Sequence, residues 1–117
     1  MINIYYYENK IAGKVYLIHQ VGTPFYTVWR IANQSCNGAC RENREVLTFK
    51  VMEQAHGYLA KLHLDRSTFV SYLFLEGELG LITEDSIELK TGEFLFDGLA
   101  TTVFHPLLKN MTLARQN

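Results

Sequence analysis

The stretch of residues 14–32, KVYLIHQVGTPFYTVWRIA, decides the fold that this sequence predicts. Two runs rich in β-branched and aromatic residues, which favour strands, flank the short segment VGTP. Within that segment, Gly22 followed by Thr23 suits a two-residue type II′ turn, because this turn favours glycine at its first position. The stretch therefore predicts an antiparallel hairpin.

The turn determines which side chains of the hairpin share a face. With two residues in the turn, His19 lies opposite Tyr26 on one face, and Tyr16 lies opposite Trp29 on the other. Both faces are partly apolar. We therefore expect a helix against one face and another element, or another subunit, against the other. The further pairs are Val21–Pro24, Leu17–Val28 and Val15–Arg30 on the first face, and Gln20–Phe25 and Ile18–Thr27 on the second.

The segment after the hairpin predicts one long helix at about residues 41–63. At about 100° per residue its polar side chains gather in a narrow sector, and its apolar side chains fill the opposite face. Gly57 lies in the polar sector and costs about 1 kcal/mol relative to alanine in a helix interior, so it marks either close packing or a weak position. The polar sector also holds Lys50, Glu53, Gln54 and Lys61, and the apolar face holds Val51, Met52, Ala55, Tyr58, Leu59 and Leu62.

Further strands are expected on both sides of this helix. The segment INIYYY at residues 2–7 adds a third strand to the hairpin. Residues 67–75, STFVSYLFL, fit a buried strand or a short helix, because periodicity does not separate the two in so short a run. A second meander follows at about residues 79–97. Its apolar pattern pairs Ile82 with Ile87, Ile87 with Phe96 and Leu89 with Phe94.

These elements predict an α+β fold with mostly antiparallel sheet. It consists of an N-terminal three-strand meander, one long helix and a C-terminal meander. A curved sheet wrapped around the central helix is the alternative. The 117 residues, nearly half of them apolar, fit a single domain over residues 1–117, with a core that needs no metal or disulfide.

Charge and composition count against several classes of partner. A net charge of −1 with 20% charged residues is unlike a basic nucleic-acid binder or a polybasic membrane binder. The N-terminal residues show no signal-peptide pattern, and no apolar run is long enough to span a bilayer. We therefore expect a soluble cytoplasmic protein with no membrane partner. Residues 67–97 hold one lysine and seven acids, which is typical of the solvated face of strands.

Both cysteines lie in the segment CNGAC, at Cys36 and Cys40. With His56 and His63 they form a superficially zinc-like pattern, but on the predicted helix the two histidines are about 10 Å apart along the axis. One zinc ion with Zn–N bonds of about 2 Å does not suit that separation, so no metal site is predicted. The spacing also differs from the C-x-x-C redox motif. Cys40 remains a candidate reactive thiol, because the predicted helix begins beside it.

No catalytic residue and no cofactor is assigned. The sequence shows no nucleophile–base arrangement, no G-x-S-x-G elbow and no glycine-rich phosphate loop. Aromatic residues crowd the N-terminal meander instead, where they serve the core, a subunit interface or a flat ligand. The candidate ligand or interface residues are Tyr16, His19, Tyr26, Trp29 and Arg30.

Three functions are compatible with this pattern. The first is a small binding or interaction module that forms a homodimer and carries no catalytic machinery. The alternative is a small-molecule-binding domain or an enzyme, with a cleft between the N-terminal meander and the helix that holds His19, Tyr26, Trp29 and Arg30, with His56 as a further lining residue. Nucleic-acid binding has the least support, because the net charge is close to neutral.

Overall fold

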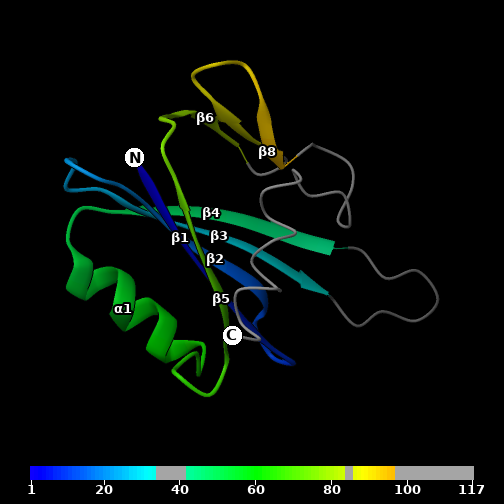
Figure 1. Cartoon of the computed structure of the whole chain (residues 1–117). Helices are drawn as coiled ribbons and strands as arrows, with labels where there is room; N and C mark the ends of the chain where they lie inside the picture. Colours follow the sequence, from blue (N-terminus) through cyan, green and yellow to red (C-terminus); the bar gives the residue numbers. More distant parts are fainter. Residues whose placement is uncertain (34–41, 84–85, 97–117) are drawn as a thin grey trace.

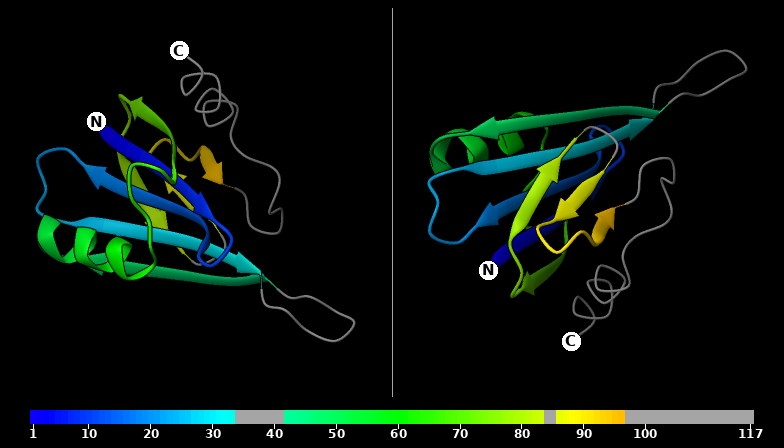
Figure 2. Two further views of the ribbon diagram at one scale, coloured as in Figure 1. Left: turned by 90° about the horizontal axis from the view of Figure 1, so that it is seen from below. Right: turned by 90° about the horizontal axis from the view of Figure 1, so that it is seen from above.

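The computed structural model describes residues 1–33, 42–83 and 86–96. In these residues a five-stranded antiparallel sheet has the order β4-β3-β2-β1-β5, and a three-stranded sheet has the order β6-β7-β8. Figures 1 and 2 show helix α1 on one side of the larger sheet and the smaller sheet on the other. The predicted α+β class with mostly antiparallel sheet is confirmed. The elements are β1 Ile2–Asn9, β2 Gly13–Gln20, β3 Tyr26–Asn33, β4 Glu42–Phe49, α1 Met52–Lys61, β5 Phe69–Leu75, β6 Leu79–Ile82, β7 Ile87–Leu89 and β8 Phe94–Phe96.

The β2–β3 hairpin has the predicted register, with His19 paired to Tyr26 and Tyr16 paired to Trp29. The expected turn type is wrong. The amide of Thr23 donates to the carbonyl of Gln20 at 3.1 Å, and Gly22 has a φ of 90°, so the tight turn covers residues 20–23 with glycine at its third position. The pairs expected nearest the turn, Val21–Pro24 and Gln20–Phe25, are accordingly absent from the strand ladder.

The turn between β1 and β2 depends on a glycine. Gly13 has a φ of 81°, and a Cβ atom at this position would lie 2.2 Å from the carbonyl oxygen of Ile31. The side chain of Asn9 closes the same turn, because its Oδ1 accepts the amide of Ala12 at 2.6 Å. Only glycine therefore allows β2 to approach β3 this closely.

The predicted helix at residues 41–63 is wrong in its first half. Residues Glu42–Phe49 form β4, which pairs along β3, and α1 begins only at Met52. Val46 packs against the core on one side of the sheet and Phe49 against the core on the other. Apolar side chains on both faces leave no strict alternation, so the helical period extended into this segment. Pairing with the free edge of β3 overrides that local pattern.

Helix α1 buries only part of its predicted apolar face. Ala55 and Leu59 are buried against the sheet, whereas Val51 and Met52, at the start of the helix, are nearly half exposed. A Cβ atom on Gly57 would meet nothing within 4 Å, so Gly57 is the weak position rather than a point of close packing. With 10 residues, α1 is too short to cross a bilayer. No helix in the described residues is long and apolar enough to do so.

The ambiguous run at residues 67–75 forms an edge strand. Residues Phe69–Leu75 make up β5, which pairs with β1. Tyr6 pairs with Ser71 but Tyr7 pairs with Phe69, so Val70 is an extra residue in a bulge. The run could not be assigned from sequence because β5 places apolar side chains on both faces of the sheet.

The C-terminal meander forms the smaller sheet. The predicted pairs Ile82–Ile87 and Ile87–Phe96 are confirmed. The third pair is wrong by one residue: Phe94 lies opposite Glu88 rather than Leu89, at an irregularity in the register.

The core has two parts, one on each face of the five-stranded sheet. Toward the smaller sheet lie Ile2, Ile4, Tyr16, Ile18, Trp29, Ile31, Leu75, Ile87 and Leu89. Toward α1 lie Ala12, Val15, Leu17, Val28, Ala55, Leu59 and Leu64. The expectation that a helix covers one face and another element the other is therefore confirmed, and the second cover belongs to the same chain.

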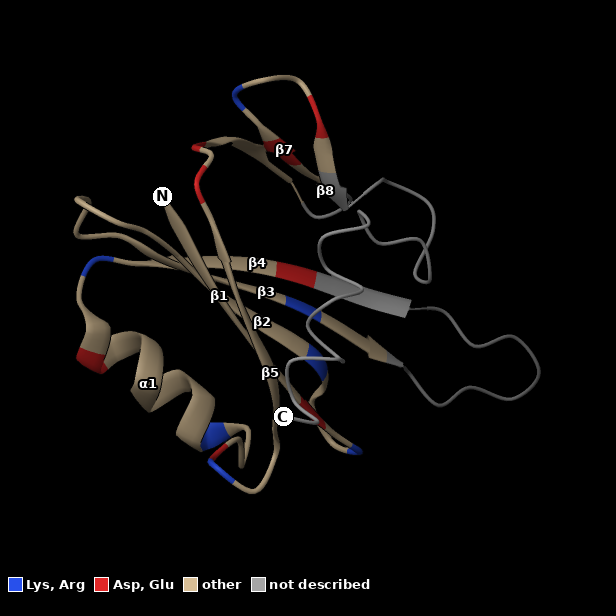
Figure 3. Cartoon of the chain, in the orientation of Figure 1, with Lys and Arg blue, Asp and Glu red and all other residues tan. Residues whose placement is uncertain are grey.

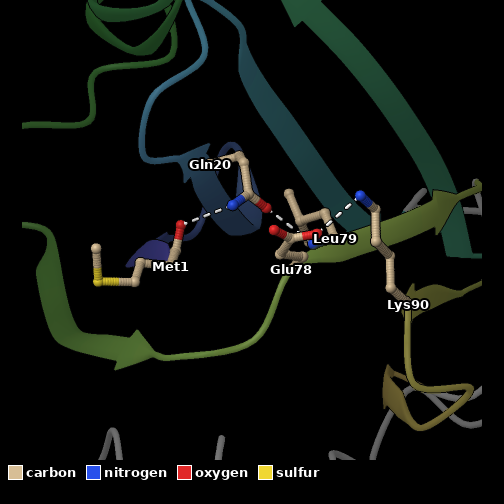
Figure 4. Close-up of polar contacts among 5 residues, drawn as sticks. All are labelled: Met1, Gln20, Glu78, Leu79 and Lys90. Carbon is tan, nitrogen blue, oxygen red and sulfur yellow. Dashed lines mark hydrogen bonds and ion pairs between the residues drawn. The ribbon is translucent and has the colours of Figure 1, made fainter.

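Polar contacts fix the smaller sheet against the larger one, as Figure 4 shows. The side chain of Gln20 donates to the carbonyl of Met1 at 3.1 Å and accepts the amide of Leu79 at 2.8 Å. Beside it, Lys90 and Glu78 form an exposed ion pair at 2.7 Å. The amide of Leu79 therefore has a partner on β2, which holds the start of β6 over the end of that strand.

Candidate functional site

Tyr16 and Trp29 are core residues of the smaller-sheet face. They are 3% and 2% exposed, and their rings lie 5.8 Å apart. The indole nitrogen of Trp29 donates to the carbonyl of Thr83 at 2.8 Å. Burial, with Tyr6 and Glu8 nearby, raises the pKa of Tyr16 far above its usual range. A partner or ligand could reach these two residues only if the smaller sheet moved away.

His19, Tyr26 and Arg30 lie on the opposite face, toward α1. The rings of His19 and Tyr26 are stacked, with centroids 4.2 Å apart and planes within 7°. The Nε2 atom of His19 lies 3.0 Å from the carbonyl oxygen of Thr23. The Nε of Arg30 donates to the carbonyl of Ala12 at 2.9 Å, which attaches this side chain to the β1–β2 turn. The structure therefore brings His19 and Tyr26 together and separates them from Tyr16 and Trp29.

Arg30 also belongs to a small polar cluster under α1. The hydroxyl of Tyr58 donates to Oε1 of Glu45 at 2.6 Å, and Glu45 lies opposite Arg30 in the β3–β4 ladder. Burial is the main reason that the pKa of Tyr58 is raised, and its bond to Glu45 adds to the effect, whereas Arg30 opposes it. These contacts hold α1 to the sheet, so Arg30 has a structural task on this face.

The helix side of β1 and β5 carries a row of aromatic pairs that the sequence did not reveal. The rings of Tyr5 and Tyr72 lie 5.0 Å apart, and those of Tyr7 and Phe69 lie 5.6 Å apart, edge to face. At the end of the row Phe74 is 44% exposed. The row was missed because residues 67–75 had no assigned element. Once β5 is known to be a strand, alternation places Tyr72 and Phe74 on one face, and the bulge at Val70 brings Phe69 onto the same face.

The outer edge of β5 differs chemically from the opposite edge of the sheet. Figure 3 shows no charged residue along β5, whose sequence is FVSYLFL. The other edge strand, β4, has the sequence ENREVLTF with three charged residues. In the described part of the chain β5 pairs with β1 alone.

A hollow of about 640 Å³ lies between α1 and the adjoining ends of β1 and β5. Of the residues that the sequence suggested for a cleft, only His56 lines it; His19, Tyr26, Trp29 and Arg30 do not. Its other lining residues come from β1, α1, the loop after α1 and the start of β5, and none of them was a predicted site residue. The lining residues are Tyr7, His56, Leu59, Leu64, Asp65, Arg66 and Phe69.

Cys36 and Cys40 lie outside the described residues. The described residues that follow form β4 from Glu42, and α1 begins only at Met52. The predicted helix beside Cys40 is therefore wrong, and the reactive thiol at Cys40 stays a prediction. In residues 1–33, 42–83 and 86–96, no three His, Cys, Asp or Glu side chains are grouped as a metal site requires. His63 lies just beyond the last residue of α1, at a positive φ.

Comparison of this chain with protein families, with curated proteins and with solved structures finds no match.

Proposed function

We propose that this chain is a binding module that pairs with a second copy of itself through the outer edge of β5. The observation that carries the proposal is the chemistry of that edge, because Phe69–Leu75 contains no charged residue and no proline. Such an edge offers backbone donors and acceptors to any other strand, and charged residues are a common protection against this pairing. The opposite edge strand, β4, carries three charged residues in its sequence, ENREVLTF.

A second copy suits this edge because an antiparallel pair of identical strands is symmetric about a two-fold axis. Each copy then donates and accepts the same backbone hydrogen bonds, as in other two-fold interfaces. Tyr72 and Phe74, which are 38% and 44% exposed, gain apolar neighbours across the new strand pair. Two five-stranded sheets join into one continuous sheet.

The strength of such a dimer follows from the same contacts. One backbone hydrogen bond contributes only about 1 kcal/mol net, and association itself costs at least about 4 kcal/mol. A pairing limited to a seven-residue strand is therefore modest. We expect a dimer that dissociates on dilution rather than an obligate one.

Sedimentation velocity over a dilution series tests this proposal. We expect the wild-type chain to shift from twice the monomer mass to the monomer mass as it is diluted. Phe74→Lys should raise the dimer Kd at least about tenfold, because it places a charge on an otherwise uncharged strand edge and removes an exposed apolar side chain from the contact. Thermal melts of both proteins report whether the substitution leaves the fold intact.

Phe94→Lys is the matched control. Phe94 is 43% exposed, close to the 44% of Phe74, but it lies on β8 in the smaller sheet. This variant has the same change of charge and size and should keep the wild-type dimer Kd. A wild-type chain that remains monomeric at every concentration contradicts the proposal, as does an equal shift of the equilibrium by both variants.

The other properties suggested by the sequence stay predictions. They are small-molecule binding in a cleft that holds His19 and Arg30, nucleic-acid binding, and a cytoplasmic location.

A further inference from the structure

The hollow beside α1 has an apolar floor and an aromatic wall. Leu59 and Leu64 are 2% and 5% exposed and close it from below. Tyr7 and Phe69 form one side, with their rings edge to face at 5.6 Å. Its volume, about 640 Å³, lies within the range of small-molecule sites. A flat hydrocarbon surface fits against such a wall.

The rim of the hollow carries two cationic or donor groups whose hydrogen-bonding capacity is unused. Arg66 and His56 both line the hollow, and neither makes a hydrogen bond or an ion pair with another described residue. The guanidinium of Arg66 has five donors arranged for bidentate contact with a carboxylate. The imidazole of His56 supplies at least one further donor.

The one carboxylate among the lining residues, Asp65, is held by its own loop through one of its two oxygens. Oδ1 of Asp65 accepts the amide of Ser67 at 2.8 Å and also the hydroxyl of Ser67. These bonds lower the pKa of Asp65, so it remains ionised and held within the loop. The groups left for a ligand at the rim are therefore the donors of Arg66 and His56 and the second carboxylate oxygen of Asp65. The donors outnumber that single acceptor, and they favour an anion.

We propose that the hollow between α1, β1 and β5 binds a small planar aromatic acid. The aromatic part lies against Tyr7 and Phe69, over the floor of Leu59 and Leu64. The carboxylate accepts hydrogen bonds from Arg66 and His56 at the rim. This inference does not depend on the pairing of β5 with a second copy.

Three probes of one shape and different charge test the inference on the full chain: 2-naphthoate, 2-naphthalenemethanol and 2-naphthylmethylammonium. Titrations followed by two-dimensional amide NMR give both the Kd and the place of binding. We expect 2-naphthoate to bind at least about tenfold more tightly than the neutral alcohol, because it adds a charge-assisted contact. The largest shifts should fall at the amides of Leu59, Leu64 and Phe69. Equal affinities, tighter binding of the ammonium probe, or shifts confined to other residues would overturn the inference.

Two variants separate the rim from general apolar binding. Arg66→Gln should weaken 2-naphthoate at least about tenfold and leave the neutral alcohol unchanged, because only the charged contact is lost. Lys61→Gln is the control. Lys61 is an exposed cation at the end of α1, and its side chain does not line the hollow. If both variants weaken 2-naphthoate equally, the effect is that of net charge and the assignment of Arg66 is wrong.

A third variant keeps this inference distinct from dimerisation. Phe74→Lys alters the exposed end of β5 but none of the residues that line the hollow. Its affinity for 2-naphthoate should equal that of the wild-type chain whatever its oligomeric state. A loss of binding in this variant places the probe at the β5 edge and overturns the site proposed here.

Discussion

The amide of Leu64 donates to the carbonyl oxygen of Leu59 at 3.0 Å, across the end of α1. The amide of His63 donates to the carbonyl of Ala60, also at 3.0 Å. Together these bonds form the Schellman motif that ends many helices. In this motif the residue that donates the shorter-range bond adopts a positive φ. That residue is His63, with a φ of 59°, where glycine is usual. The same turn brings Leu59 and Leu64 together in the floor of the hollow.

Replacing His63 with glycine should therefore stabilise the chain. A side chain at a positive φ costs of the order of 1 kcal/mol, and we expect a gain of about that size in the free energy of unfolding by urea denaturation. His56→Gly is the control, because His56 lies in the helix interior, where glycine costs a few tenths of a kcal/mol. A loss of stability for His63→Gly shows that the imidazole contributes more than its backbone strain costs.

Two further glycines make a pair of opposite predictions. Gly57→Ala should raise the free energy of unfolding by up to about 1 kcal/mol, because Gly57 is exposed inside α1 and a Cβ there meets nothing within 4 Å. Gly13→Ala should lower it by more than about 2 kcal/mol, since its Cβ would lie 2.2 Å from the carbonyl oxygen of Ile31 at a positive φ. Urea denaturation of both variants gives the comparison. A loss of stability for Gly57→Ala means that the helix packs there more tightly than the structure shows.

The parts of the fold that depend on local pairing could be predicted from the sequence. The register of the β2–β3 hairpin follows from its pattern of side chains, and it survives the wrong turn type because the pairing of Leu17 with Val28 buries both residues. The sequence pattern of β4 could not be distinguished from that of a helix. Its apolar residues face two different layers, Val46 toward one and Phe49 toward the other, and only the free edge of β3 selects the extended conformation.

The candidate site was predicted less well than the fold, for a physical reason. Sequence showed that Tyr16 and Trp29 share one face and His19 and Tyr26 the other. Which face stays accessible depends on where the smaller sheet packs, and that contact joins residues more than fifty positions apart, such as Trp29 and Thr83. The same holds for the hollow, which forms only when β5 returns beside β1 and brings Phe69 to Tyr7.

The side chain of Ser71, on the edge strand β5, carries an unpaired polar group. Its hydroxyl is buried and has no hydrogen-bond partner among the described residues. Ser71→Ala removes an unpaired polar group, so we expect unchanged stability or a gain of up to about 1 kcal/mol in urea denaturation. Thr83→Ala is the control, because the Thr83 hydroxyl accepts the amide of Ser86 at 3.0 Å and its removal should cost about 1 kcal/mol. A clear loss for Ser71→Ala means that the hydroxyl bonds to a group outside the described residues.

Burial of Tyr16 predicts a loss of stability at high pH. Its pKa is raised in the folded chain, first by burial and then by Tyr6 and Glu8, so the folded state keeps the hydroxyl protonated. In the unfolded chain a tyrosine ionises near pH 10. The contribution is therefore fully present below about pH 10 and is lost as the pH rises above it, by up to about 1.4 kcal/mol for each pH unit. Urea denaturation at several alkaline pH values measures this slope.

Tyr16→Phe should be less stable at neutral pH by about 1 kcal/mol, because it loses a hydrogen bond with Tyr6. Its free energy of unfolding should fall less steeply above pH 10. An unchanged slope in Tyr16→Phe means that other tyrosines, such as Tyr5 and Tyr7, account for the alkaline transition.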